Sequence, residues 1–379
     1  MTPDSHPDSY RDLTHELYMH RCLELAQLGA GNVAPNPMVG AILVYDGRII
    51  GEGYHQKYGE AHAEVNCINS VKEKERNLIP QSTLFVSLEP CDHFGKTPPC
   101  TDLIIHQKIP KVIIGCRDPF IEVNGKGIEK LETAGVEVAS GILENECREL
   151  NKRFFTFHTQ HRPYIILKWA QTADGKIAAP LNPPKGGTFE TSDSRKENSS
   201  RLLISNENTN RLVHKWRSEE AAILVGTNTA LYDDPELTTR LWPGHSPVRL
   251  VVDMDLRLPS SLKIFNRQTK TIIFNHIKHD EGENLLYWQV TTDVSIVHQV
   301  VNALYLLNIQ SVLVEGGAKL LQSFIDEGMW DEIRVIRNLE LLIGNGLPAP
   351  EFHGADKIDE QNILSDTIDI YKHPVTSNQ

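Results

Sequence analysis

Residues 83–101 read TLFVSLEPCDHFGKTPPCT, an apolar strand that runs directly into two Pro-Cys pairs. The strand predicted over residues 83–88 delivers Cys91 at its carboxyl end, which is where open α/β sheets present their ligands. Pro99 favours a helix that begins at Cys100, because proline is preorganised for the first turn of a helix. The stretch therefore predicts an α/β domain that places two thiols at one edge of its sheet.

A third metal-binding side chain lies upstream, in the run His62-Ala63-Glu64. The set His62, Cys91 and Cys100 offers zinc three ligands and leaves the fourth tetrahedral position to water, as in catalytic zinc sites. Glu64 is near enough to share that water without binding the metal. A carboxylate in that position can pass a proton to a leaving amine. The predicted chemistry is hydrolytic deamination of a ring amidine carbon, with Glu64 as the catalytic residue.

Three other interpretations of this cluster stay open from the residues alone. A structural zinc would need a fourth soft ligand, and the next thiol, Cys116, sits in the apolar run 112–116, which is typical of a buried strand. Cys91 and Cys100 could instead form a disulfide bond, or the matched residues could co-occur by chance. The ligand count favours the catalytic site over the structural one.

The composition is that of a soluble globular enzyme with two domains, because 379 residues exceed what one hydrophobic core normally supports. No segment approaches the roughly 18 apolar residues that span a bilayer, and residues 1–5 are polar and acidic, unlike a signal peptide. Six cysteines are too few for a disulfide framework, and Cys22, Cys67, Cys116 and Cys147 lie in apolar patterns typical of reduced core residues. We therefore expect a cytoplasmic protein.

The distribution of charge argues against a nucleic-acid partner. The net charge is −12, with 22 acidic and 14 basic side chains in residues 1–150 and 28 and 24 in the remainder. Binding a nucleic-acid backbone requires clustered Lys and Arg, and neither half offers such a cluster. A small phosphorylated substrate needs only a few local donors, so it is compatible with an acidic protein.

Helical and strand-like patterns alternate along both halves, and the boundary between the halves falls near residues 157–162. The first half shows strand patterns at 39–44, 48–53, 83–88, 111–115 and 136–138, and helical patterns at 14–29, from His62, from Cys100, at 127–134 and at 143–157. The second half shows strand patterns at 164–170, 221–225, 248–253, 271–275, 311–314 and 332–336, and helical patterns at 296–307 and 318–327. Residues 180–200 are rich in Pro, Gly, Lys and Ser, which predicts a mobile surface loop.

The long loop between Cys91 and Cys100 sets this chain apart from most zinc nucleobase deaminases, whose second motif ends in Cys-x-x-Cys. Residues 87–101 and the upstream run PNPMVGA at 35–41 closely resemble the deaminase half of the bifunctional riboflavin-biosynthesis deaminase/reductase family. The resemblance implies an N-terminal cytidine-deaminase-like domain, a three-layer α/β/α fold. It also implies hydrolytic deamination of 2,5-diamino-6-(5-phosphoribosylamino)pyrimidin-4-one.

Three runs in the second half resemble the dihydrofolate-reductase-like α/β domain of the same family. They are LKWAQTADGKIA at 167–178, GTNTALYDDPELTTR at 226–240 and VEGGAKL at 314–320. The resemblance implies NADPH-dependent reduction of the ribosyl side chain, which gives 5-amino-6-(5-phosphoribitylamino)uracil. The run LISN at 203–206 departs from the family's usual pattern, because Leu203 stands where a Trp is common, so we expect the packing there to differ.

Carried over position by position, the resemblance implies a cofactor site and a substrate site. The residues expected to contact NADPH are Ala170, Thr229, Asp233 and Gly317. Those expected to contact the substrate are Arg217, Leu237, Arg240 and Glu315. Forked guanidinium groups hold a phosphate monoester well, which suits the two arginines. The two glycines at 316–317 would let a phosphate reach bare backbone N–H groups, although such turns also occur for purely steric reasons.

The sequence therefore predicts a zinc-dependent pyrimidine deaminase domain at 12–157 and an NADPH-dependent reductase domain at 162–379. We expect a small phosphoribosyl pyrimidine substrate, no nucleic acid, no membrane and a homo-oligomer. One rival is a nucleic-acid deaminase with an appended domain, which the charge and the long loop disfavour. The other is a zinc-stabilised regulatory module that senses a nucleotide. Glu64 disfavours the second rival, because binding alone needs no carboxylate beside the metal water.

Overall fold

The computed structural model describes residues 8–94, 98–178 and 203–374, with the side chains described from residue 13 onward. The chain divides into two compact units, residues 1–162 and residues 163–379, which are described separately below. The insertion at 180–200 lies outside the described residues. In the part of the chain that the structure describes, no helix is both long and apolar enough to cross a membrane.

The first unit is built on a five-stranded sheet in the order β2-β1-β3-β4-β5. Its strands are β1 (Gly40–Tyr45), β2 (Arg48–Tyr54), β3 (Thr83–Leu88), β4 (Lys111–Cys116) and β5 (Glu137–Ser140). β1 runs antiparallel to β2 and β3, whereas β3, β4 and β5 are parallel. Asp46 and Gly47 close the β1–β2 hairpin with positive φ angles of 46° and 70°, as an Asp-Gly turn predicts.

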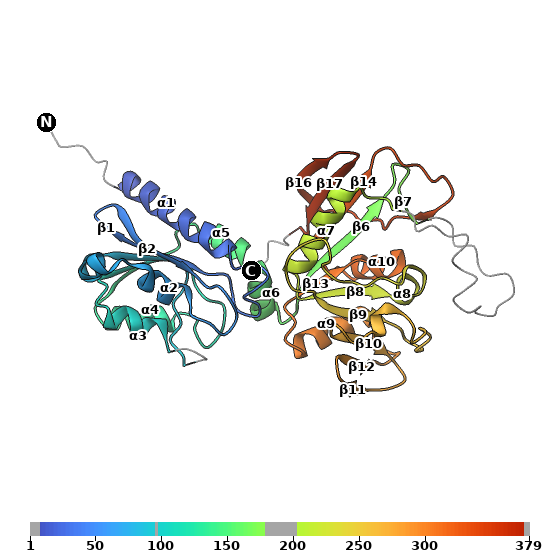
Figure 1. The fold of residues 1–379 in the computed structure, drawn as a ribbon, viewed down its shortest axis with the longest axis horizontal. Helices are drawn as coiled ribbons and strands as arrows, with labels where there is room; N and C mark the ends of the chain where they lie inside the picture. The colour runs from blue at the N-terminus through green and yellow to red at the C-terminus, as the bar shows by residue number, and fades with distance from the viewer. Residues whose placement is uncertain (1–7, 95–97, 179–202, 375–379) are drawn as a thin grey trace. The chain divides into compact units, whose positions relative to one another are not determined.

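Helices cover both faces of this sheet and make it the middle of three layers (Figure 1). One face carries α1 (Asp8–Gln27) and α5 (Glu144–Leu150), and the other carries α2 (Ala63–Ser70), α3 (Cys100–His106) and α4 (Lys126–Thr133). Successive strand residues point to opposite faces, so Phe85 packs under α1 while Leu84 and Val86 pack under the other helices. A 3₁₀ segment, η1 (Glu73–Gln81), leads into β3.

The single helix predicted over residues 143–157 is wrong. The chain forms α5 and then α6 (Lys152–Gln160), with a break at Asn151, whose φ of −103° and ψ of 23° leave the helical region. The Asn151 side chain bonds the backbone of Met38, 113 residues away in the sequence. The apolar pattern continues across the break, so the sequence gives no sign of this distant contact.

The second unit contains a ten-stranded sheet in the order β11-β12-β10-β9-β8-β13-β6-β14-β17-β16. The parallel strands are β6 (Tyr164–Gln171), β8 (Ala222–Gly226), β9 (Val248–Val252), β10 (Thr271–Asn275), β12 (Leu285–Gln289), β13 (Ser311–Val314) and β14 (Glu332–Asn338). The antiparallel strands are β11 (Asp280–Gly282), β16 (Asp356–Ile363) and β17 (Asp366–Lys372). A separate pair joins β7 (Lys176–Ala178) to β15 (Leu347–Pro348).

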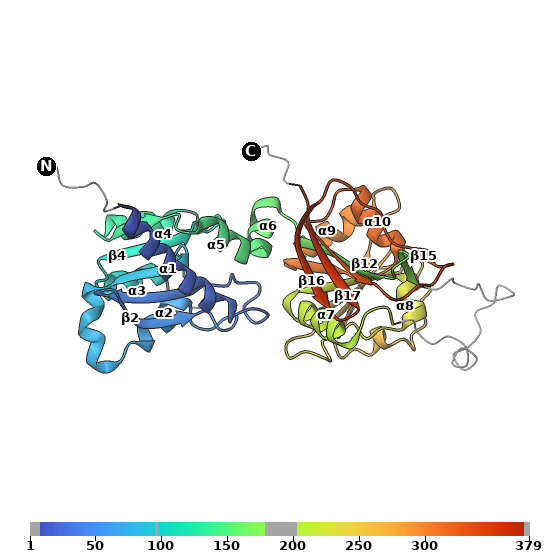
Figure 2. The same ribbon diagram turned by 90° about the horizontal axis from the view of Figure 1, so that it is seen from above.

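Helices lie on both faces of the second sheet (Figure 2). α9 (Ile296–Leu306) and α10 (Ala318–Asp326) pack on one face; α7 (Glu207–Glu219), α8 (Thr227–Asp233) and the 3₁₀ turn η2 (Lys263–Phe265) pack on the other. The sequence analysis predicts α9 and α10 but not α7. Only Thr209, Val213, His214 and Trp216 of α7 are buried, so its sequence is mostly polar and carries a weak helical signal.

Candidate active sites

Three metal-binding side chains meet at the carboxyl end of β3. His62 is the N-cap of α2, Cys91 follows β3, and Cys100 opens α3. His62 Nδ1 lies 3.5 Å from Cys91 Sγ and 3.4 Å from Cys100 Sγ, and the three ligand atoms lie within 4.8 Å of one another. The structure therefore brings together the ligands that the sequence predicts from three separate elements.

These separations fit zinc. With Zn–N near 2.0 Å and Zn–S near 2.3 Å, tetrahedral geometry places a nitrogen and a sulfur roughly 3.5 Å apart. Cys100 is buried, while His62 and Cys91 are partly exposed. A metal held here would keep one coordination position for a small molecule from solvent.

Two of the alternative interpretations of the cysteines disagree with the structure. Cys116 is buried in β4, where its thiol donates to the carbonyl oxygen of Ser87 at 3.5 Å, and it lies outside the three-residue cluster. A structural zinc would therefore lack this fourth ligand. All six cysteines, Cys91 and Cys100 included, are free thiols, which excludes the disulfide in this structure. The prediction that Cys22, Cys67, Cys116 and Cys147 are reduced core residues is confirmed.

Glu64 lies in the first turn of α2, beside the ligand cluster. Only 3% of its surface is exposed, and its carboxyl group lies beside the thiol of Cys100. Burial raises the pKa of Glu64, and the negative charge of Cys91 raises it further. A carboxyl group with a raised pKa is suited to accept and return a proton near neutral pH.

The two thiols titrate as a pair. The hydrogen bond between them lowers the pKa of Cys91 and raises the pKa of Cys100. The hydrogen bond between His62 and Cys91 is the main cause that raises the pKa of His62. Cys91 is therefore readily ionised, as a thiolate ligand for zinc must be.

Glu89, which the sequence analysis does not single out, fixes a second loop beside Cys91. Its buried carboxylate accepts four backbone N–H bonds at 3.0–3.3 Å, from Asp118, Gly125, Gly127 and Ile128. The chain approaches so closely here that a Cβ on Gly127 would lie 2.1 Å from the carbonyl oxygen of Pro90. The only signal in the sequence is an acidic residue between an apolar strand and a Pro-Cys pair.

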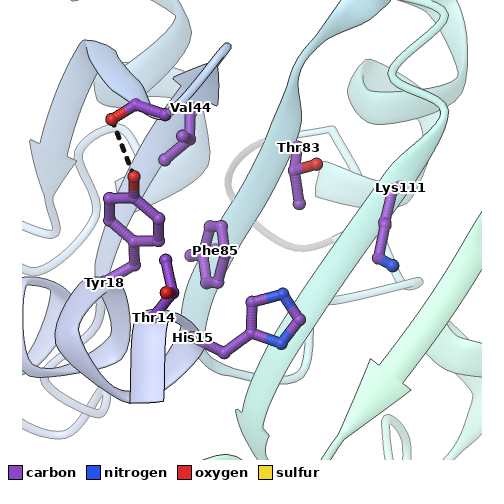
Figure 3. Close-up of a pocket in the computed structure, with 8 residues that line it drawn as sticks. Thr14, His15, Tyr18, Val44, Thr83, Phe85 and Lys111 are labelled. Atoms are coloured by element: carbon purple, nitrogen blue, oxygen red, sulfur yellow. Dashed lines mark hydrogen bonds between the residues drawn. The ribbon is translucent and has the colours of Figure 1, made fainter. Parts of the chain in front are cut away.

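A separate hollow of about 340 Å³ lies at the other edge of the first sheet (Figure 3). Its lining residues are Thr14, His15, Tyr18, Val44, Gly47, Thr83, Phe85 and Lys111. Thr83 and Lys111 are the first residues of β3 and β4, whereas the metal cluster lies at the last residues of β3. This hollow is therefore distinct from the metal site.

In the second unit, several of the predicted site residues gather at the carboxyl ends of three adjacent strands, β8, β13 and β6. Ala170 lies near the end of β6, Thr229 is on α8 directly after β8, and Glu315 follows β13. Gly317 is the N-cap of α10. The carboxyl edge of parallel strands is where α/β sheets bind their ligands, and here chain connections leave it in different directions.

The turn at 316–317 has two features: close packing that requires glycine, and uncapped N–H groups at the start of α10 that a ligand can bind. A Cβ on Gly316 would lie 2.9–3.0 Å from Val225 and Thr229, so close packing requires glycine there. Gly317 has φ +78° and no side chain caps the N-terminus of α10. Uncapped N–H groups beside the Thr229 hydroxyl fit a phosphate of NADPH. Any side chain at 317 would strain the backbone, so replacement of Gly317 cannot isolate cofactor binding.

Arg217 and Glu315 form a buried ion pair. Arg217 Nε and Nη2 donate to the two carboxylate oxygens at 2.8 and 2.6 Å, and Lys168 Nζ lies 3.9 Å from the same carboxylate. Burial alone would raise the pKa of Glu315, but the charges of Arg217 and Lys168 outweigh it and lower the pKa to about 2. Glu315 is therefore ionised throughout the neutral range, and the fork of Arg217 is engaged with it.

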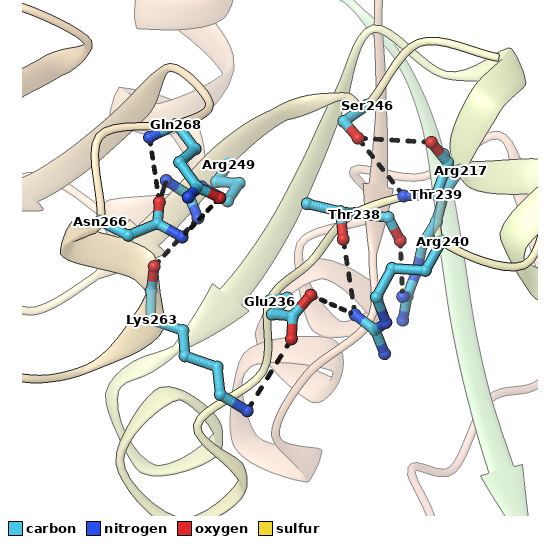
Figure 4. Close-up of polar contacts among 10 residues, drawn as sticks. All are labelled: Arg217, Glu236, Thr238, Thr239, Arg240, Ser246, Arg249, Lys263, Asn266 and Gln268. Carbon is cyan, nitrogen blue, oxygen red and sulfur yellow. Dashed lines mark hydrogen bonds and ion pairs between the residues drawn. The ribbon is translucent and has the colours of Figure 1, made fainter.

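The remaining residues predicted for the substrate site lie on the loop from Glu236 to Arg240 (Figure 4). Arg240 is nearly half exposed and donates to Glu236 at 3.2 Å and to the hydroxyl of Thr238 at 3.4 Å. Leu237 has φ +54°, and its side chain is 2% exposed within a core cluster. Only its backbone can therefore face a ligand. Asp233 is the last residue of α8, and Leu203 is exposed.

Two family models match separate parts of the chain. The cytidine and deoxycytidylate deaminase zinc-binding region matches residues 13–116, and the RibD C-terminal domain matches residues 163–350. The first match contains the metal cluster and Glu64. The second contains all eight residues predicted for the cofactor and the substrate.

Curated relatives match nearly the whole chain. Riboflavin biosynthesis protein RibD of Aquifex aeolicus is 41% identical over 87% of this chain and 88% of its own, and that of Escherichia coli strain K12 is 33% identical over 84% and 86%. Among solved structures, a diaminohydroxyphosphoribosylaminopyrimidine deaminase/5-amino-6-(5-phosphoribosylamino)uracil reductase from Thermotoga maritima is 35% identical. Its TM-score is 0.82, over 96% of this chain and 99% of that one.

Proposed function

Because the chain belongs to the RibD family of riboflavin biosynthesis enzymes, we propose how its own residues carry out the family's two reactions. The chain is a bifunctional enzyme with a cytidine-deaminase-like domain and a reductase domain. It deaminates 2,5-diamino-6-(5-phosphoribosylamino)pyrimidin-4-one with zinc and then reduces the ribosyl side chain with NADPH, which gives 5-amino-6-(5-phosphoribitylamino)uracil. The observation that carries this assignment is a relationship over almost the full length, which includes both units.

In the deaminase, the zinc would be held by His62 Nδ1 and the thiolates of Cys91 and Cys100. When bound, zinc supplies the Lewis acidity that activates water at neutral pH. Glu64 takes a proton from that water and delivers it to the amino group that leaves as ammonia. The support is its burial beside Cys100 and its position in the first turn of α2, two residues after His62. Glu89 holds the neighbouring loop and keeps Cys91 in place.

In the reductase, NADPH would be held by Ala170, Thr229, Asp233 and the backbone at Gly317, and it would supply the hydride. Arg240 binds the substrate phosphate, because its guanidinium is exposed and its partners are surface groups. Arg217 holds Glu315 ionised and oriented toward the sugar, and Leu237 contributes its backbone. These roles divide the two arginines, which the sequence analysis treats alike.

We assign residues 12–157 to the deaminase domain and residues 162–379 to the reductase domain. The division of the chain between Arg162 and Pro163 supports this assignment. A cytoplasmic location is supported by the six free cysteines, because thiols stay reduced in that compartment. The absence of a nucleic-acid partner and a homo-oligomeric state both stay predictions; light scattering on the purified protein would measure the oligomeric state.

The two activities can be separated by product mass. Incubation of the purified protein with the diaminopyrimidinone substrate and zinc, without NADPH, is expected to exchange an amino group for oxygen and release ammonia. Addition of NADPH is then expected to add two hydrogens to the product. A product that gains two hydrogens before it loses the amino group would contradict the order of the reactions.

Arg240→Ala is expected to raise the KM of the reductase for its phosphoribosyl substrate by about 10- to 150-fold. The change removes a charge-assisted contact of ~1.5–3 kcal/mol. The KM for NADPH and the rate of deamination should not change. Arg257→Ala is the matched control, because Arg257 is also an exposed, ion-paired arginine on a loop of this unit. A substrate KM that stays at the control value would place the phosphate elsewhere.

A further inference from the structure

The break between α5 and α6 carries a two-point contact with the segment 35–39. Asn151 is 3% exposed; its Oδ1 accepts from the backbone N–H of Met38 at 2.8 Å, and its Nδ2 donates to the carbonyl oxygen of Met38 at 2.9 Å. One planar amide thereby satisfies both backbone groups of one residue, as a neighbouring strand would. Met38 lies within the family-model match to the zinc-binding region, which covers residues 13–116, whereas Asn151 lies beyond its end.

The segment that Asn151 holds leads to the metal site. Asn36, two residues before Met38, has its Nδ2 3.1 Å from His55 Nε2, and His55 Nδ1 lies 3.0 Å from the carbonyl oxygen of Ala61. Since a carbonyl can only accept, Nδ1 is the donor and Nε2 accepts from Asn36. The ring of His55 also packs edge-on against that of His62, with centroids 5.4 Å apart. A continuous set of contacts therefore joins Asn151 to a zinc ligand.

Only asparagine provides this clamp at this length. Aspartate keeps the acceptor but loses the donor, so its charge faces the carbonyl oxygen of Met38. Alanine leaves both backbone groups of Met38 without the side-chain partner, which is costly for each group that water does not reach.

We propose that Asn151 is a positioning residue of the deaminase, which holds the segment 36–39 so that Asn36 and His55 keep the imidazole of His62 in its place. It acts through these residues and does not touch the reacting atoms. The proposal rests on the assignment of the zinc site to His62, Cys91 and Cys100. It places a determinant of deamination outside the metal motifs, at the junction of two short helices.

The test compares Asn151→Asp, Asn151→Ala and Asn77→Asp in the full-length chain. Asn77 is exposed in η1 of the same unit, so Asn77→Asp controls for the added charge. Both Asn151 variants are expected to lower kcat/KM for ammonia release about 10- to 100-fold, because a small misplacement near a reacting site has an effect of this size. Zinc content should not change. The reductase of the same preparation, assayed on the deaminated intermediate, should stay within about twofold of wild type.

The pH dependence distinguishes positioning from a loss of packing. A protonated aspartic acid again offers one donor and one acceptor to Met38, and burial raises the pKa of a carboxyl group. The deaminase activity of Asn151→Asp relative to wild type should therefore rise as the pH is lowered toward about 5. The relative activity of Asn151→Ala should stay constant. Arg148 and Lys152 flank Asn151 in the sequence, and His55 is linked to it through Asn36 and Met38. These groups are common to all variants.

Two outcomes would overturn the proposal. One is wild-type kcat/KM in Asn151→Ala at neutral pH. The other is a loss of activity that follows a loss of zinc or of thermal stability, which would make Asn151 a structural residue only. Failure of the underlying zinc assignment has a different signature, because Cys100→Ala would then retain zinc whatever the Asn151 variants do.

Discussion

Glu64→Gln is expected to slow ammonia release by about 10²–10⁴ while the zinc content stays unchanged. The amide keeps the shape of the side chain but can no longer accept the proton from water. Glu64 is buried beside the thiol of Cys100, yet it does not belong to the three-residue ligand cluster. Proton transfer should therefore be lost without loss of the metal. Ammonia release and metal content are measured on the same preparation.

Glu60→Gln is the matched control, because Glu60 lies two residues on the other side of His62 and is exposed in a surface pair with Lys57. It should deaminate at the wild-type rate. The reductase domain of the Glu64→Gln chain should still accept the deaminated intermediate, which shows that the second unit is folded, while the retained zinc reports the fold of the first. A rate within a few-fold of wild type would remove the proton-transfer role from Glu64. An inactive Glu60→Gln variant would instead indicate a general disturbance of the start of α2.

The metal site could be predicted from the sequence because its information is local. The apolar strand 83–88 fixes the position of Cys91, Pro99 marks the start of α3 at Cys100, and His62 opens α2. Each of these signals depends on a few neighbouring residues. The buried faces of the strands then require α2 and α3 to pack on the same sheet as β3, so the ends that carry the ligands meet.

The break at Asn151 could not be predicted in the same way. The residues around it keep the spacing of one continuous helix, and its cause is a hydrogen-bonded partner at Met38, which no local pattern reveals. The four N–H bonds to Glu89 are hidden for the same reason, since they come from residues 29 to 39 positions away. Hydrogen bonds between a side chain and a backbone group far away in the sequence cannot be predicted from the periodicity of apolar residues.

In the reductase site, too, a contact between charged residues distant in the sequence could not be predicted. The resemblance assigns Arg217 and Arg240 to one substrate site, but it does not show that Glu315, 98 residues from Arg217, occupies the guanidinium fork of Arg217. Arg217 lies on α7, a helix whose mostly polar sequence gives a weak signal. The structure thus distinguishes Arg217, which is buried and paired with Glu315, from Arg240, which is exposed and can bind a phosphate.

Cys100→Ala is expected to abolish zinc binding and, with it, deamination, while the reductase remains active. The wild-type protein should bind one zinc ion per chain through His62, Cys91 and Cys100. Removal of one thiolate leaves two protein ligands, which are too few for a stable tetrahedral site. Cys91→Ser should behave similarly, since a neutral hydroxyl is a poor replacement for a thiolate. Metal analysis after dialysis, together with an ammonia assay, measures both effects.

Cys67→Ala provides the matched control for this prediction. Cys67 and Cys100 are both buried, at 0% and 1% exposure, and both lie on helices of the same unit, but only Cys100 faces the ligand cluster. The two substitutions remove the same atom and leave a cavity of similar size, so a difference in zinc content reports ligation and not packing. Full zinc occupancy in Cys100→Ala, or equal loss in both variants, would contradict the ligand assignment. A loss confined to Cys100→Ala would establish that this thiolate binds the metal.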